Sequence, residues 1–234
     1  MPTDDIPTSL TQAAYQRLRA DLLACRIRPG ERVRINDVCR QFEVSLGAVR
    51  EALSRLTSEG LVVAEPQRGF RAAPITAEEL RDLTMVRVDV EGHCLRRSIA
   101  LGDLAWESQV VSTFHLLSRT PERVHDDPRR VSEAFSQAHG AFHAALVAAC
   151  ASPTLLRVRA QLFAQSERYR RLSVPLDAGE RDLNAEHGAI AQAVLARDAR
   201  TAVRLMTRHL ECTTAIVLAG ATWLAEPNVP VDAA

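Results

Sequence analysis

Four of the chain's seven histidines fall on the apolar faces of segments with helical periodicity. His139 and His143 are four residues apart and share one helix face, while His187 and His209 lie in the apolar stripes of two later segments. A single histidine in such a place is more often a core residue whose partner is a backbone carbonyl. Four together favour a metal centre, because each buried imidazole needs a partner and one ion supplies it for all.

A set of imidazoles alone restricts which metal this centre can hold. Imidazole nitrogen suits Zn, Ni, Cu and Fe(II), whereas the harder Mg and Ca prefer oxygen ligands. We therefore expect a divalent transition metal, with Zn or Ni ahead of Cu or Fe. Four neutral ligands leave the charge of a dication uncompensated, which favours an anionic ligand in any open coordination position.

Two arginines are candidates for binding such an anion. Arg87 falls in an apolar stripe that includes Leu83 and Val90, and a buried cation needs a counterion. An internal salt bridge to Glu91 and the binding of an anionic effector explain its position about equally well. Arg170 is the second candidate.

The neighbours of Arg170 leave an alternative open. Tyr169 and Arg171 flank it and offer further polar contacts. An exposed charged face is the alternative interpretation for at least two of these three residues.

Glycines, prolines and capping residues divide the second part of the chain into the elements that would position these side chains. Thr76 and Glu79 form a capping box, and no strand pattern appears beyond them. We expect six helices packed as an antiparallel bundle. Their expected ranges are Ala77–Leu101, Leu104–Arg119, Pro128–Ala151, Pro153–Leu172, Arg181–Arg197 and Ala199–Ala219.

The first part of the chain contains two helical patterns separated by a short turn, from Val38 to Gly60. Apolar residues recur at three- and four-residue spacing in the second pattern, and Ser45 stands at its N-cap position. An inward face of Val49, Ala52, Leu53 and Leu56 leaves Leu46, Gly47, Arg50 and Ser54 facing outward. This spacing fits a DNA-reading helix-turn-helix and also an ordinary helical hairpin.

The residues that follow favour the first of these interpretations. Strand-like runs at Leu61–Ala64 and Phe70–Ala72 flank the turn Pro66–Gly69, which carries Arg68. A helix-turn-helix followed by a basic-tipped hairpin is a winged helix. A first helix is expected from a capping box at Ser9 and Gln12 to about Cys25.

Four short motifs in this region are similar to the N-terminal domain of the GntR superfamily of bacterial transcription regulators. They are PGERV at Pro29–Val33, VREAL at Val49–Leu53, EGLV at Glu59–Val62 and RGF at Arg68–Phe70. The resemblance implies DNA contacts from Ser45, Arg50 and Gly69. The family usually has an arginine where this chain has Leu46, so Leu46 either packs on a thymine methyl or adds nothing to readout.

The six-helix region resembles the FadR-like branch of the same superfamily, in its shorter VanR-type (FCD) form. Many members bind a divalent metal through an Asp and a His four apart and a His on each of the last two helices. Here His139 stands in place of that Asp. The resemblance also implies an arginine on the first bundle helix near a metal-bound carboxylate effector, which favours the effector role for Arg87.

The composition of the chain restricts the class of protein and the cell compartment in which it works. Eleven arginines stand against seven acidic residues in 10–75, and 18 against 20 in 76–234, so the basic excess lies in the DNA-binding part. The five cysteines are widely spaced with no C-x-x-C pair, which is typical of buried cytosolic thiols. We find no secretory leader and no membrane-spanning segment, and expect a cytoplasmic protein.

We therefore expect a mainly α chain with a winged helix-turn-helix over 1–75, a six-helix metal- and ligand-binding domain over 76–222 and a tail over 223–234. DNA contacts are expected from Ser45, Leu46, Gly47, Arg50, Arg68 and Gly69. The predicted function is a transcription regulator, a repressor by analogy with the family, that binds a pseudo-palindromic operator as a homodimer and responds to a small carboxylate. A metalloenzyme using the four histidines is the alternative, and a metal-free ligand-binding bundle is a third.

Overall fold

The computed structural model describes residues 10–177 and 181–220. The chain divides into two compact units between Ile75 and Thr76, and each is described here by itself. The predicted capping residue Ser9 and the predicted tail over 223–234 lie outside the described residues. Within the described ranges, no helix has the length and apolar character that crossing a membrane requires.

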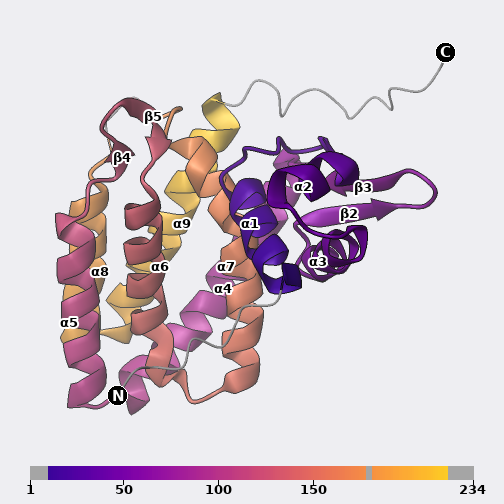
Figure 1. Cartoon of the computed structure of the whole chain (residues 1–234). Helices are drawn as coiled ribbons and strands as arrows, with labels where there is room; N and C mark the ends of the chain where they lie inside the picture. Colours follow the sequence, from indigo (N-terminus) through magenta and orange to yellow (C-terminus); the bar gives the residue numbers. More distant parts are fainter. Residues whose placement is uncertain (1–9, 178–180, 221–234) are drawn as a thin grey trace, which may run out of the picture. The chain divides into compact units, whose positions relative to one another are not determined.

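The N-terminal unit is a winged helix-turn-helix, as predicted (Figure 1). Its three strands form an antiparallel sheet in the order β1-β3-β2, and the β2–β3 hairpin is the wing. The strand β1 was not predicted, because two residues carry no periodicity and only pairing with β3 defines it. The elements are α1 (Leu10–Leu23), β1 (Arg32–Val33), α2 (Ile35–Phe42), α3 (Leu46–Ser58), β2 (Val62–Glu65) and β3 (Gly69–Ala72).

Helix α3 has one face in the core and one face in solvent. The hydroxyl of Ser45 accepts a hydrogen bond from the backbone N–H of Ala48 at 3.2 Å, which fixes where the helix begins. The four apolar residues of the inward face are completely buried against α1 and α2. These residues are Val49, Ala52, Leu53 and Leu56.

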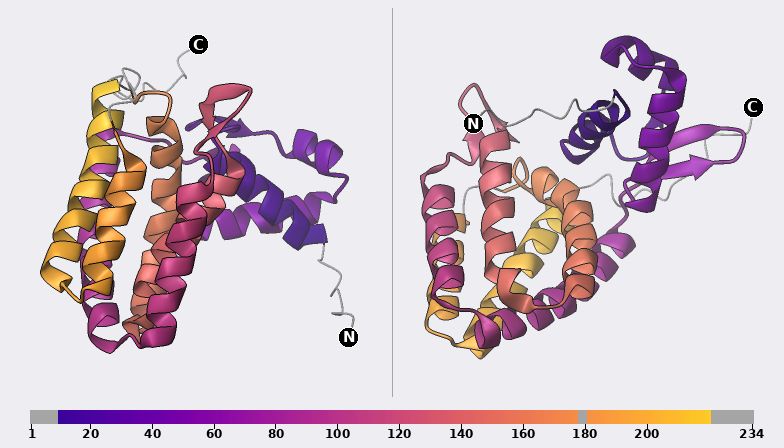
Figure 2. Two further views of the ribbon diagram at one scale, coloured as in Figure 1. Left: turned by 90° about the vertical axis from the view of Figure 1, so that its left-hand side faces the viewer. Right: turned by 60° about the horizontal axis from the view of Figure 1, so that its bottom comes forward.

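The C-terminal unit is a helical bundle that also contains one short hairpin (Figure 2). Helix α4 packs against α7 and α9, and α5 packs against α6 and α8. The apolar side chains of these helices form one continuous core. The elements are α4 (Ala77–Leu101), α5 (Leu104–Arg119), β4 (Arg123–Val124), β5 (Asp127–Val131), α6 (Glu133–Val147), the 3₁₀ turn η1 (Ala148–Cys150), α7 (Pro153–Ser173), α8 (Leu183–Leu195) and α9 (Ala199–Gly220).

Two predictions about this unit were wrong in detail, namely that it contains no strands and that its third helix begins at Pro128. The third bundle helix begins at Glu133 and not at Pro128, because Pro128 lies in β5, which pairs with β4. Proline at a helix start and proline in an edge strand give the same local signal, so the sequence did not separate them. The actual N-cap is Ser132, whose hydroxyl accepts from the backbone N–H of Phe135.

The cysteine prediction was correct only in part. Only Cys94 and Cys150 are buried, and the other three cysteines are partly exposed.

The packing predicts unequal effects for two identical leucine truncations. Leu146 on α6 is completely buried, whereas Leu116 on α5 is 60% exposed. We expect Leu146→Ala to lower the free energy of unfolding by about 2–5 kcal/mol. Leu116→Ala should change it by less than about 0.5 kcal/mol. Urea denaturation of both variants measures the difference, and equal losses would contradict the position of Leu146 in the core.

Candidate functional site

The bundle interior brings the four predicted histidines together. His139 and His143 come from consecutive turns of α6, His187 from α8 and His209 from α9, and all four are buried. The ring centroids of His139 and His143 are 4.3 Å apart, and those of His187 and His209 are 4.7 Å apart. One ring nitrogen from each residue can be chosen so that all four lie within 4.8 Å of one another.

The protonation state of the cluster suits a metal ion. Burial lowers the pKa of His139, His143 and His187 well below the usual value, and the neighbouring imidazoles lower it further. The rings are therefore neutral at pH 7, which leaves a lone pair on each for coordination.

Three of the four histidines have ring nitrogens that no described residue satisfies. Among the described residues, Nδ1 of His139, both ring nitrogens of His143 and Nε2 of His187 have no hydrogen-bond partner. Nitrogens bonded to one ion at about 2.1 Å lie at most about 4.2 Å apart. The cluster therefore needs only a small contraction to hold a metal ion.

His209 is oriented by residues that the sequence reasoning missed. Its Nδ1 lies 2.8 Å from Oε2 of Glu186, and Arg181 donates to both carboxylate oxygens of Glu186 and to the backbone carbonyl of His209. An Nδ1–H donated to Glu186 leaves Nε2 of His209 without its proton. Nη2 of Arg181 also lies 3.2 Å from Nδ1 of His209. Both atoms are donors in this tautomer, so they form no hydrogen bond with each other.

The carboxylate of Glu186 stays ionised in this arrangement. Burial raises its pKa, but the hydrogen bonds from Arg181 and His209 lower it to about 2. Glu186 directly precedes His187 in the sequence, and that adjacency to a candidate ligand is the signal that could have identified it.

Arg87 forms the internal ion pair with Glu91 that was one of its two predicted roles, and part of its guanidinium is left over. Its Nη2 lies 3.5 Å from Oε1 of the fully buried Glu91, while Nε has no hydrogen-bond partner among the described residues. Glu91 is paired more closely with Arg159, at 2.9 Å, and Arg159 also donates to the backbone carbonyl of His143. Because Arg159 already neutralises Glu91, the positive charge of Arg87 is only partly compensated.

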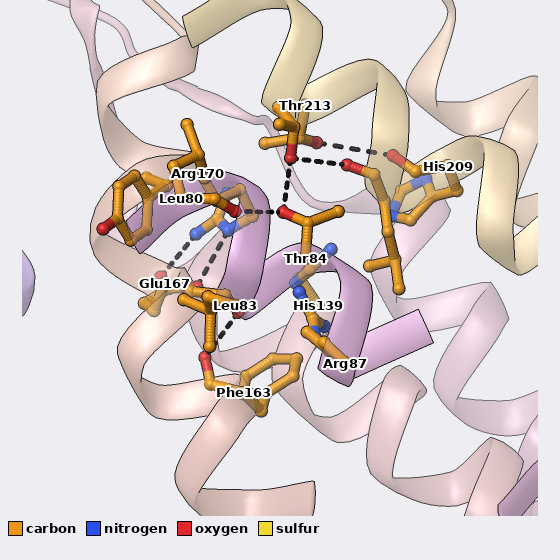
Figure 3. Close-up of a pocket in the computed structure, with 14 residues that line it drawn as sticks. Leu80, Leu83, Thr84, Arg87, His139, Phe163, Glu167, Arg170, His209 and Thr213 are labelled. Atoms are coloured by element: carbon orange, nitrogen blue, oxygen red, sulfur yellow. Dashed lines mark hydrogen bonds and ion pairs between the residues drawn. The ribbon is translucent and has the colours of Figure 1, made fainter. Parts of the chain in front are cut away.

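Arg87 and two of the four histidines line a small cavity (Figure 3). The side chains of Arg87, His139 and His209 border it, and Arg170 lies at its other side with Glu167. Its volume of about 30 Å³ holds one or two water molecules in this conformation. Its complete lining is Leu80, Leu83, Thr84, Arg87, His139, Phe163, Ser166, Glu167, Tyr169, Arg170, His209, Leu210, Thr213 and Thr214.

Arg170 is held mainly by its own helix. Its Nε and Nη2 donate to the two carboxylate oxygens of Glu167, and Nη2 also donates to the hydroxyl of Ser136. Only Nη1 lacks a hydrogen-bond partner among the described residues. The alternative of an exposed charged face is wrong, because Tyr169 is buried and the side chain of Arg171 is 11% exposed and paired with Glu133.

A second and larger cavity borders the cluster on the α5 and α8 side. It has a volume of about 460 Å³, and His187 and Phe135 form part of its wall. The polar residues Glu122 and Asn184 also line it. No sequence pattern indicated this cavity, because its lining comes from the ends of separate elements.

The residues predicted to contact DNA lie on the outside of the N-terminal unit. Leu46, Gly47 and Arg50 are exposed on α3, and Arg50 has no hydrogen bond or ion pair among the described residues. At the wing, Arg68 is exposed, and Gly69 has φ +92°, a left-handed conformation that favours glycine. The geometry leaves one face of α3 and the wing tip open to a partner.

Two family models match the two units of the chain. The model of bacterial regulatory proteins, gntR family, matches residues 10–71, and the model of the FCD domain matches residues 82–211.

The relatives and solved structures agree with this assignment. The HTH-type transcriptional regulator BphR of Paraburkholderia xenovorans (strain LB400) is 41% identical over 209 residues, covering 89% of this chain and 85% of BphR. The HTH-type transcriptional repressor GlaR of Escherichia coli (strain K12) is 34% identical over 201 residues, covering 84% of this chain and 90% of GlaR. The crystal structure of a GntR transcriptional regulator from Rhodococcus sp. RHA1 is 26% identical, with a TM-score of 0.71, over 91% of this chain and 99% of that one.

These matches decide between the regulator and the metalloenzyme that the four histidines had left as alternatives. Both family models and the relatives described above are those of transcription regulators, and none is an enzyme. The chain therefore belongs to the GntR family of bacterial transcription regulators and joins a DNA-binding winged helix to a C-terminal FCD domain.

Proposed function

We propose that this regulator is a cytoplasmic repressor whose C-terminal unit holds a divalent transition metal and binds a small organic carboxylate beside it. Binding of the carboxylate lowers the affinity of a homodimer for a pseudo-palindromic operator. The observation that carries the proposal is the cluster of four buried, neutral imidazoles next to the buried cation of Arg87. Three of these imidazoles have a ring nitrogen without a partner among the described residues. The term repressor is used for GlaR, and it is extended to this chain as part of the proposal.

The outward face of α3 supports the DNA-reading role. Arg50 projects from this face and has no partner in the part of the chain that the structure describes, so its guanidinium is available to a phosphate or a guanine. Leu46 and Gly47 adjoin it, the cap of Ser45 leaves the helix N-terminus open, and Arg68 and Gly69 stand at the wing. One small winged helix offers little interface, which is why two copies on a two-fold operator are proposed.

Arg50→Ala tests the reading helix. The variant should bind operator DNA about 5- to 150-fold more weakly, as expected for the loss of one contact worth ~1–3 kcal/mol. Its melting temperature should not change, because Arg50 is exposed and outside the core. Gel shift against the upstream DNA of its own gene measures the affinity, with Arg119→Ala on α5 as the exposed-arginine control. Wild-type affinity in Arg50→Ala would rule out α3 as the reading helix.

The metal proposal rests on His139, His143, His187 and His209 as ligands. Imidazoles alone suit Zn or Ni, and also Cu or Fe. When bound, the ion would supply positive charge and an open coordination position to an anionic ligand. Glu186 and Arg181 would hold the ring of His209 toward the site.

Metal content and metal-dependent stability test the ligand set. The purified protein should contain about one transition metal ion per chain, and a chelator should lower its melting temperature, because an ion bound only by the folded state stabilises it. His143→Ala and His209→Ala should lose both the metal and the chelator-induced shift. His115→Ala, an exposed histidine on α5, is the matched control and should keep both. Full metal occupancy in His143→Ala and His209→Ala would contradict the site.

The surroundings of the cavity support a carboxylate as the effector. Arg87 offers Nε and a weakly paired Nη2, and Arg170 offers Nη1, so both cations have donors left for an anion. The cavity accommodates a carboxylate group in place of water, and a larger ligand requires side chains such as Leu83 and Phe163 to move. A ligand that requires such movement acts on DNA binding only if it favours one conformation of the dimer over another.

A screen of small carboxylates by thermal shift on metal-loaded protein tests this role. Compounds that raise the melting temperature should release operator DNA in gel shift from the wild type and from Arg81→Ala, an exposed-arginine control on α4. They should release little or no DNA from Arg87→Ala and from metal-stripped protein, because both lack positive charge at the cavity. Equal release from all four proteins would refute this mechanism.

A further inference from the structure

Leu46 is a large apolar residue that the N-terminal unit does not use in its core. It is the first residue of α3 and is 49% exposed, whereas Leu53 and Leu56 of the same helix are completely buried. The residue before an N-cap often makes an apolar contact with the first turns of the helix. Here that residue is Val44, which packs against the core that contains Val49. Leu46 is therefore not needed for folding and is presented outward.

The surface next to Leu46 is open at Gly47. A Cβ atom placed on Gly47 would meet only Oγ of Ser45, at 3.9 Å, among the described residues. The hydroxyl of Ser45 already caps the helix. The first hydrogen-bonding side chain on this face is Arg50, one turn further on. At its N-terminal end, α3 therefore offers a partner an apolar contact and close approach of the backbone.

Only one base presents a matching group in the major groove. Guanine, cytosine and adenine show hydrogen-bond donors and acceptors there, whereas thymine also shows its C5-methyl group. We propose that Leu46 is a specificity-determining residue that contacts the C5-methyl of a thymine in each half-site and so selects a T·A pair. This inference rests on the proposed role of α3 as the reading helix, in which Arg50 fixes the register.

The experiment begins with full-length wild type, Leu46→Ala and Leu46→Arg, each used to select binding sites from random duplex DNA. Wild type should enrich T·A at one position of each half-site, and Leu46→Ala should lose the preference at that position alone. Leu46→Arg should shift it toward G·C, because arginine pairs with guanine. Leu116→Ala, an exposed leucine on α5, should select the same site as wild type.

Replacing the selected thymine by deoxyuridine then removes only the methyl group. Wild type should lose about fourfold in affinity per half-site, the equivalent of one buried methyl, and Leu46→Ala should lose nothing. The inference is overturned if wild type ignores the methyl group, or if Leu46→Ala responds to it as strongly as wild type. Arg50→Ala separates a failure of the reading-helix assignment from a failure of the thymine contact. Wild-type affinity of Arg50→Ala for DNA would reject α3 as the reading helix. Weaker binding by Arg50→Ala, together with no effect of substitutions at Leu46, would reject only the thymine contact.

Discussion

The burial of four neutral imidazoles in one bundle interior is the constraint on which the C-terminal unit depends. A buried ring nitrogen without a partner has lost its hydrogen bonds to water and gained nothing in return. Several nitrogens of His139, His143 and His187 are in this position within the described part of the chain. A shared metal ion removes that cost for all of them at once, which is why the cluster supports a metal proposal more strongly than any single residue does.

The charged residues around the cluster are arranged to hold it in place. Arg159 joins the carboxylate of Glu91 on α4 to the backbone of α6 at His143, and Arg181 joins Glu186 to the backbone of α9 at His209. Both carboxylates are thereby paired, and neither is left as an isolated buried charge. Arg87 shares Glu91 with a closer partner, and this leaves it as the cation with spare donors at the cavity.

In the N-terminal unit, the candidate functional residues lie outside the core. The apolar side of α3 is buried in the core, and the described contacts give the outward residues of this helix no role in folding. A leucine and an arginine one turn apart give this face one apolar and one charged contact. That combination suits the edges of base pairs, which differ in methyl groups and in hydrogen-bonding atoms.

Most of the local elements, and the faces they present, were predictable from the sequence. Caps such as Ser45 and Thr76, and apolar repeats such as that around Leu53, depend on interactions within a few residues, so the helix starts and inward faces were predictable. The sequence also placed each of the four histidines on an inward face. It did not find β1, because a strand of two residues is defined only by its pairing with β3. It did not find the β4–β5 hairpin, because Pro128 gave the signal of a helix start.

Tertiary structure alone decided which charges meet. Arg159 on α7 pairs with Glu91 on α4, and Arg181, which precedes α8, donates to the backbone carbonyl of His209 on α9. No local spacing predicts either contact. The partner of Arg87 was predictable as Glu91, four residues on, but its incomplete neutralisation depends on Arg159 from α7. Local periodicity fixes the direction of a side chain, whereas its partners depend on how the helices pack.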